Sequence, residues 1–364
     1  MRVFRDNFGL APVEMDRIIH PISQNVMANS LFFKLPQPMQ WAAWILLGLA
    51  GYLVFDQIHW WNLREDYSFG YIVPIFVGYV IFDRLPKITQ LLGLGKDGPD
   101  KSVAPSDVPS NGVFTFLLTS VAVSAIICGF VFIGFGAVYR AAEGAATIAS
   151  MMAAAGFAAV LLGMVFLVSD RNVQGEPMSL RSRVALAALF IFPAFIWLLS
   201  APTFSSLEQR ISTMLLNKVT VVVFGVFDFL GMDIIRQGSV LILPKGSVGV
   251  EDACSGIRSL TASLFAGSFM AAVFYESWFK KISLLVASAC LAFFGNLCRS
   301  LFLTTWAYKH GSDSIEGFVH DATGYAVMGV TIVGLIGLVF LFNIKFEYDD
   351  PKVPNIAPPP GPVA

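Results

Sequence analysis

One of the four cysteines in this sequence stands in a setting that favours chemistry. Cys254 follows a polar, glycine-containing stretch and directly precedes a long apolar block, so it lies at the expected start of a helix. The positive end of a helix dipole favours a thiolate, and Arg258, one turn later on the same face, favours it further. The alternative interpretation is a small buried cysteine with no catalytic role.

Two later residues suit the same chemistry. Arg299 lies inside the apolar segment FFGNLCRSLFLTTW, where a charge is costly and by default marks a functional site. Asn296 shares its helix face, three residues earlier. His320 stands at the expected start of the last apolar block, and an imidazole suits proton transfer near neutral pH. The alternatives are an arginine that snorkels to the headgroups and an interfacial histidine with a solvated ring.

The other cysteines indicate neither a disulfide framework nor a metal site. Cys128, Cys290 and Cys298 lie within apolar blocks, and no CxxC pair or Cys/His metal spacing occurs. The sequence also lacks a helical HExxH motif and a GxSxG serine elbow, which disfavours a metalloprotease and a serine hydrolase. We therefore expect no cofactor and no metal. A nucleophile, a base and a cation are the minimum set for thiol acyl transfer.

Composition indicates that membrane-spanning elements position these residues. Of the 364 residues, 56% are hydrophobic and 13% are charged, and the mean hydropathy is +0.69. The charged fraction of a soluble domain is roughly twice as large. Several apolar blocks are long enough to cross a bilayer. The net charge of −1 gives no support to a nucleic-acid partner.

The sequence predicts an all-α polytopic membrane protein with about eight transmembrane helices. We expect them at residues 39–56, 71–83, 113–137, 144–168, 184–201, 256–275, 282–306 and 322–343. A small β-hairpin is predicted between 234 and 250, because two β-rich runs flank a Pro/Gly turn. Residues 204–230 are amphipathic in places, which predicts a helix on the membrane surface rather than a ninth span.

Lysines and arginines orient the chain, because they concentrate on the cytoplasmic side. With a cytoplasmic N-terminus, most basic residues fall in cytoplasmic segments, whereas the outer loops 57–70 and 138–143 hold one each. Cys254, Arg299 and His320 then all lie toward the outer face. The first 30 residues lack the pattern of a cleaved signal peptide. The expected segments are 1–38 (cytoplasmic), 39–345 (membrane domain, with a flexible cytoplasmic loop at 97–112 and an outer segment at 202–255) and 346–364 (disordered cytoplasmic tail).

The segments around these residues resemble the exosortase/archaeosortase family of membrane transpeptidases. The matching stretches are 251–260 (EDACSGIRSL), 295–299 (GNLCR) and 320–324 (HDATG). The hairpin before the cysteine and residues 66–74 (DYSFGYIVP) also resemble the family pattern. Many bacterial members have a histidine where Phe69 stands, so a polar role at that position is absent here.

The resemblance implies a multi-pass enzyme of the inner (plasma) membrane that processes secreted proteins at its extracytoplasmic face. Its substrates would carry a C-terminal sorting signal, consisting of a short motif such as Pro-Glu-Pro, a transmembrane helix and a basic tail. Cys254 would be the nucleophile and His320 the general acid/base, and Arg299 would orient the substrate or stabilise the oxyanion. Ser255, Arg258 and Asn296 would support these residues or orient the substrate. The acceptor would be a lipid or a glycan.

Two other functions stay open from the residues. An intramembrane cysteine protease would use the same residues with water as the acceptor. A transporter or channel could place Arg299 and His320 along a path, although the sequence shows no inverted repeat or paired broken helices. Membrane lipids are expected partners in every case.

Overall fold

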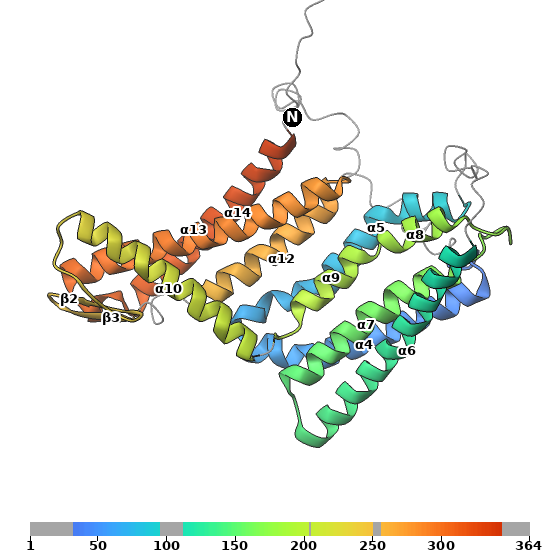
Figure 1. Cartoon of the computed structure of the whole chain (residues 1–364), viewed down its shortest axis with the longest axis horizontal. Coiled ribbons are helices and arrows are strands. Elements are labelled where there is room, and N and C mark those ends of the chain that lie inside the picture. Colours follow the sequence, from blue (N-terminus) through green and yellow to red (C-terminus); the bar gives the residue numbers. More distant parts are fainter. Residues whose placement is uncertain (1–31, 95–111, 204, 250–255, 344–364) are drawn as a thin grey trace, which may run out of the picture.

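A computed structural model describes residues 32–94, 112–203, 205–249 and 256–343. Long helices dominate this part of the chain (Figure 1). Their bounds are α4 (Gln37–Leu63), α5 (Val73–Leu91), α6 (Gly112–Glu143), α7 (Thr147–Val168), α8 (Leu180–Ala188), α9 (Ile191–Ser200), α10 (Ser205–Phe229), α12 (Gly256–Phe274), α13 (Trp278–His310) and α14 (Phe318–Asn343), with the 3-10 helices η1 (Glu65–Ile72) and η3 (Ser312–Ile315). Helices α5 and α9 lie between a group formed by α4, α6 and α7 and a group formed by α12, α13 and α14.

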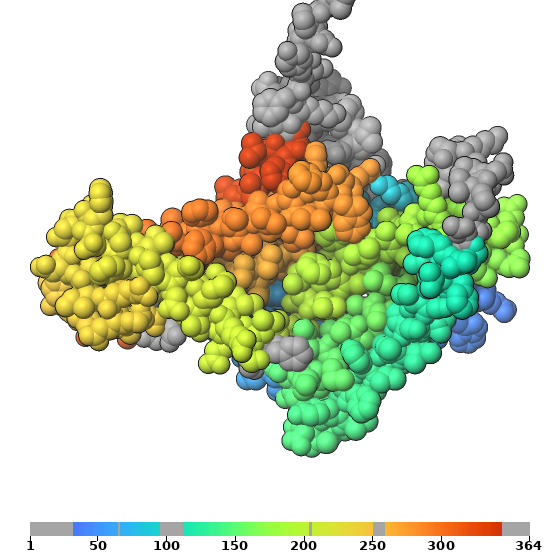
Figure 2. Space-filling model, viewed as in Figure 1, coloured from blue at the N-terminus to red at the C-terminus, as the bar shows by residue number. Residues whose placement is uncertain are grey.

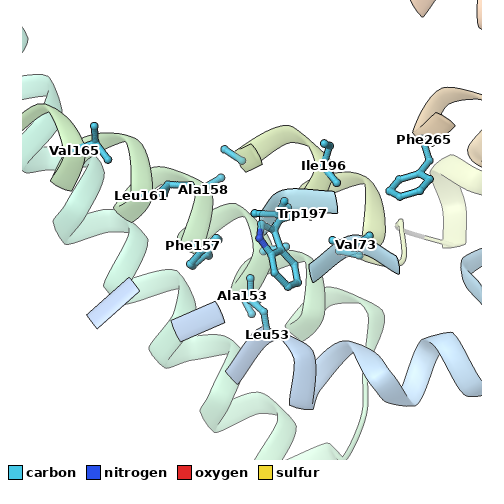
Figure 3. Packing of buried hydrophobic residues seen from close by; sticks show 14 of the residues in the cluster. Leu53, Val73, Ala153, Phe157, Ala158, Leu161, Val165, Ile196, Trp197 and Phe265 are labelled. Carbon is cyan, nitrogen blue, oxygen red and sulfur yellow. The ribbon is translucent and has the colours of Figure 1, made fainter. Parts of the chain in front are cut away.

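A tryptophan in α9 anchors the first group of helices. Trp197 is buried and meets Phe157 of α7 edge-on, with ring centroids 5.9 Å apart. Leu53 of α4 and Ala153 of α7 lie beside it in the same core cluster (Figure 3). These buried contacts hold α4, α7 and α9 together.

Helices α6 and α7 pack at very short range, because glycine and alanine repeat every seven residues on both of them. A Cβ added at Gly156 would lie 2.5 Å from the carbonyl oxygen of Gly129, and one at Gly129 would lie 2.7 Å from that of Gly156. Gly163 faces Ala122 in the same way. Small residues at such positions allow backbones to approach closely in membranes.

The segment predicted as one helix over 184–201 consists of two helices, α8 and α9, which meet at residues 189–190. Pro193 explains the interruption, since its ring clashes with the carbonyl four residues earlier and it has no N–H to donate. That carbonyl belongs to Leu189, and the guanidinium of Arg84 donates to it. A side chain from α5 therefore satisfies the backbone group that the proline leaves unpaired.

The predicted hairpin is part of a three-stranded antiparallel sheet. Strands β1 (Ile235–Gln237), β2 (Val240–Leu243) and β3 (Gly246–Gly249) pair in that order, so β1 is an addition to the prediction. Gly238 in the first turn and Gly246 directly after the second have positive φ. Leu243 and Val248 are buried against Leu303 and Ala307 of α13. The sheet, α10 and the end of α13 form a lobe beside the bundle (Figure 2).

By length and hydropathy alone, eight helical segments of the described chain can cross a membrane. They include Ser206–Phe229 of α10 and omit α12, whose apolar stretch Ser259–Phe274 is shorter. The end contacts of α10 decide how it runs. Near its start Glu208 accepts from Arg64, just after α4, and near its end Phe227 packs on Tyr308, near the end of α13.

Both ends of α10 therefore lie at one face of the bundle. Thr261, near the start of α12, donates to the carbonyl of Asp66 just after α4 (3.3 Å), and α13 returns antiparallel to α12. The ends of α4 and α13 and the starts of α12 and α14 thus share one face, called the site face below. This agrees with the prediction of a surface helix. The eight segments that run between the two faces are α4, α5, α6, α7, α8–α9, α12, α13 and α14.

Candidate active site

Arg299 and His320, which the sequence places on different helices, meet at the site face. Nη2 of Arg299 lies 3.0 Å from Nε2 of His320 and donates to the His320 carbonyl at 3.2 Å. His320 is the third residue of α14, and Arg299 lies eleven residues before the end of α13. The arginine is thus farther from its helix end than the sequence estimate of about seven residues.

The contact fixes the roles of the two imidazole nitrogens. Arginine has five N–H donors and no acceptor, so Nε2 of His320 must accept. The ring proton then resides on Nδ1, which lies 3.5 Å from a carboxylate oxygen of Asp321. Nε of Arg299 is buried and has no acceptor within the described residues. The guanidinium therefore bonds the histidine, and its Nε–H is left without an acceptor among the described residues.

A cavity of about 650 Å³ opens beside this pair, between α12, α13 and α14. Its volume is typical of sites that bind small molecules or short segments. Polar and apolar groups both line it: Ser68, Ser259, Ser263, Asn296, Arg299, His320, Asp321, Gly324, Tyr325 and Thr331, with Ala262, Ala266, Val327, Met328, Ile332 and Leu335.

The lining changes character along α14. It begins at His320 and Asp321 and ends at Ile332 and Leu335, about 22 Å farther along the helix at 1.5 Å per residue. Except for Thr331, the polar side chains gather toward the site face, and most aliphatic ones lie toward the middle of the bundle. An amphiphilic ligand matches this gradient.

One wall of the cavity also faces the surroundings of the bundle. Tyr325, Met328 and Ile332 line the cavity and are 72%, 54% and 48% exposed. They recur three and four residues apart, so they form one stripe along α14. The cavity is therefore bounded sideways by side chains that a bilayer would contact.

The 3-10 helix η1 brings Ser68 to the cavity from the opposite side, and an ion-pair network holds it there. The Arg64 guanidinium donates to the carboxylates of Asp66 and Glu208, which ties η1 to the start of α10. The hydrogen bond to Glu208 raises the pKa of Arg64 above its ordinary value, so the charge is permanent. Thr261 of α12 bonds the Asp66 carbonyl, which anchors the same turn to a cavity wall.

Contacts of aromatic residues also hold η1 in place. The hydroxyl of Tyr67, a buried residue, lies 3.2 Å from the Thr203 hydroxyl and accepts from the Thr203 N–H at 3.0 Å. Gly70 lies so close to the Trp61 ring that a Cβ there would be 2.1 Å from the indole nitrogen. Phe69 packs on Phe265 of α12, with centroids 4.6 Å apart.

The remaining predicted site residues fall into two groups. Asn296 is 5% exposed and lines the cavity on the same side of α13 as Arg299. Cys254 and Ser255 lie outside the described residues, as does the side chain of Arg258. Cys298 was expected to pack elsewhere on the helix; it is exposed and does not line the cavity, because it follows Asn296 by two residues and so points to another face.

The sequence interpretation missed most of the cavity lining. Ser259, Ala262, Ser263 and Ala266 recur three and four residues apart on α12, which is the pattern of a close helix contact or a groove. That periodicity was visible in the sequence. Which helix faces it was not, because the spacing within one helix does not identify its neighbour.

The fold and this site define a polytopic all-α membrane protein with a polar, partly buried site at one face of its bundle. The family model of transmembrane exosortases matches residues 60–337, which is most of the chain. The chain belongs to the transmembrane exosortase family. Neither a curated protein nor a solved structure matches it. Membership supports a membrane transpeptidase-like role in general, since the family's enzymes are generally cysteine transpeptidases.

Proposed function

We propose that this protein is a membrane cysteine transpeptidase that cleaves a C-terminal sorting signal from secreted proteins and transfers them to an acceptor. The observation that carries the proposal is the contact between Arg299 and His320 at the mouth of the cavity. The two residues come from different helices and were selected from the sequence by residue type. Their meeting beside a cavity supports a joint role in one reaction.

In the proposed reaction, Nε2 of His320 takes the thiol proton of Cys254, and the resulting thiolate attacks the carbonyl carbon of the peptide bond after the recognition motif. The C–N bond breaks, His320 protonates the leaving amine, and a thioester forms. An acceptor nucleophile then attacks the thioester, loses its proton to His320 and releases the thiolate. The guanidinium of Arg299, whose Nε has no acceptor among the described residues, would stabilise the oxyanion in both steps.

The histidine must have a ring nitrogen available for this chemistry. Nε2 of His320 accepts from Arg299 in the structure. We propose that Arg299 turns its donors to the substrate carbonyl when a substrate binds, which releases Nε2 for proton transfer. Ser255, Arg258 and Asn296 would orient the substrate or support these residues.

The gradient of the cavity fits a substrate that is anchored in the membrane. The proposed substrate carries a Pro-Glu-Pro-like motif, a transmembrane helix and a basic tail. Its motif would reach the polar end near Arg299, and the residues that follow would lie along Met328 and Ile332. The site face would be extracytoplasmic in the inner (plasma) membrane, with both chain termini in the cytoplasm. The acceptor would be a lipid or a glycan.

Co-expression with a tagged sorting-signal protein tests the proposal. Cys254→Ser and His320→Gln should each abolish processing while the enzyme still accumulates in the membrane. Cys298→Ser is the matched control, because that thiol is exposed and lies outside the cavity. Full processing by Cys254→Ser, or equal loss with Cys298→Ser, would disprove the mechanism.

The mass of the product distinguishes transfer from simple hydrolysis. An added group at the new C-terminus supports the transpeptidase, whereas a free carboxylate indicates an intramembrane cysteine protease with water as acceptor. A thioester-linked adduct that hydroxylamine releases is expected in either case.

A further inference from the structure

Two buried cations lie near the face of the bundle opposite the site. Arg84 of α5 and Lys281 of α13 are 6% and 8% exposed. Both lie against the ring of Phe192 in α9: the guanidinium carbon is 5.9 Å and the ammonium nitrogen 4.8 Å from its centroid. Three helices thus bring two like charges to one aromatic ring.

Neither cation forms an ion pair with a described residue. Arg84 donates to the carbonyls of Leu189 and Ala272, which are neutral acceptors. The ammonium of Lys281 contacts the rings of Phe192 and Trp278 (5.2 Å to the latter) and makes no hydrogen bond or ion pair with any described residue.

Two carboxylates lie within electrostatic range of the cations, Asp83 of Arg84 and Glu276 of Lys281, but neither forms an ion pair with them among the described residues. Glu276, at the turn before α13, pairs instead with Lys87 on the exposed surface. Asp83 is adjacent to Arg84 in sequence, but the two form no ion pair in the described part of the chain. Because buried charges are normally paired, two close cations without an ion-pair partner indicate a ligand that the described residues do not supply.

The position of the pair matches the level of lipid headgroups. Trp278 begins α13, is 46% exposed and stacks on Phe192 with centroids 5.7 Å apart, as tryptophans at membrane interfaces do. Lys280 donates to the carbonyl of Phe342 near the end of α14, so the start of α13 and the end of α14 lie at the same level. Nζ of Lys281 has no hydrogen-bond partner among the described residues, yet it is not fully buried. The tip of the side chain therefore stays accessible at the surface.

We infer that the phosphate of an anionic phospholipid headgroup binds to Lys281 and Arg84 at this face. A lipid is favoured over a free anion because exposed apolar side chains flank the cations. Phe279 is 79% and Ile282 57% exposed, and they offer a surface for acyl chains next to the phosphate. Basic pockets between transmembrane helices bind phospholipid headgroups in this way. The bound lipid would join α5, α9 and α13.

Lysines are common near cytoplasmic helix ends for topological reasons alone. That explanation covers Lys280, which is exposed, but not the burial of its neighbour Lys281. The two adjacent lysines therefore provide a matched pair for a test.

The full-length protein is reconstituted in nanodiscs of phosphatidylcholine, with or without phosphatidylglycerol, and its thermal unfolding is followed. Phosphatidylglycerol should raise the Tm of the wild type by a few degrees, since binding to the folded state stabilises it. The shift should disappear in Lys281→Gln and Lys281→Met and persist in Lys280→Gln. A shift that persists in both Lys281 variants, or that Lys280→Gln loses equally, would overturn the inference.

Two further arms keep the result decisive. Inorganic phosphate added to phosphatidylcholine nanodiscs should leave the Tm unchanged; an equal shift would show an anion site rather than a lipid site and overturn the lipid assignment. Native mass spectrometry of the wild type should show retained phosphatidylglycerol. If the Lys281 variants do not fold, the absence of any retained phosphatidylglycerol on the wild type would refute the proposal.

Discussion

Arg299 is the residue on which the geometry of the candidate site depends. Its guanidinium contacts both the ring and the carbonyl of His320 and keeps a buried N–H without a described acceptor. A planar fork of several donors makes this possible, since one group bonds the histidine while another stays available. A compact ammonium has no such fixed geometry.

Arg299→Lys should therefore lower processing of a sorting-signal protein by about 100-fold or more, the usual cost of losing one oxyanion donor. The charge is kept, so membrane insertion should be unchanged. Arg210→Lys makes the same substitution on the exposed surface of α10 and should process normally. Wild-type rates in Arg299→Lys would show that charge alone suffices.

The apolar end of the cavity yields a second prediction at this scale. Ile332→Trp should fill the cavity and slow processing at least tenfold, whereas Val333→Trp should not. Both residues are exposed on α14, but only Ile332 lines the cavity. Processing rates of a membrane-anchored reporter measure the difference. An equal effect of the two substitutions would mean that the cavity is not the binding path.

At the scale of elements, the α6–α7 pair is the most tightly fitted. Each of Gly129 and Gly156 faces the other's carbonyl oxygen at a distance that no Cβ tolerates. Lipid tails are as apolar as these helices, so the hydrophobic effect does not drive the two helices together. Close packing of their backbones must hold them instead. The repeat of small residues is therefore a packing surface rather than a flexible region.

Gly156→Ala should destabilise the protein by about 1–3 kcal/mol, as overpacking of a close contact does. The clash is with backbone, which cannot rotate away. Gly134→Ala on α6 is the matched control: nothing lies within 4 Å of its added Cβ, so stability should hold or rise by up to about 1 kcal/mol. Unfolding in detergent compares the two, and equal stability would argue against the packing described.

At the scale of the whole molecule, α10 and the sheet form a lobe attached to the site face. Contacts at Arg64 and Tyr308 hold the two ends of the helix at that face. The same arginine carries the ion pairs that seat η1 beside the cavity. Arg64 thus links the lobe to the site, in addition to the packing of the sheet on α13.

The path of α10 predicts the accessibility of its ends. In a background without the native cysteines, Ser206→Cys and Phe229→Cys should react with a membrane-impermeant maleimide from the same side. Gln90→Cys, exposed at the end of α5, should react only from the other side. At 1.5 Å per residue the helix is long enough to cross a bilayer, so labelling of its two ends from opposite sides would contradict the contacts.

The sequence alone determined the class of the molecule and the residues worth testing. Apolar blocks reveal membrane helices because hydropathy is a local property, and seven of the eight spans follow from it. The helices of the structure extend beyond the predicted bounds, as α13 does, because hydropathy marks the apolar core of a helix and not its ends. Arg299, His320 and Asn296 were selected by type and position, and the structure brings all three to one cavity.

Other features depended on tertiary contacts between distant segments. The course of α10 and the burial of Lys281 both arise from contacts between distant parts of the chain. By hydropathy alone, α10 is a better candidate for a membrane span than α12. The contacts at the two ends of α10 show that both ends lie at the same face. The prediction for Cys254 stays a prediction, since that residue lies outside the described part. Local patterns record what each segment can do, whereas long-range packing decides which neighbours it meets.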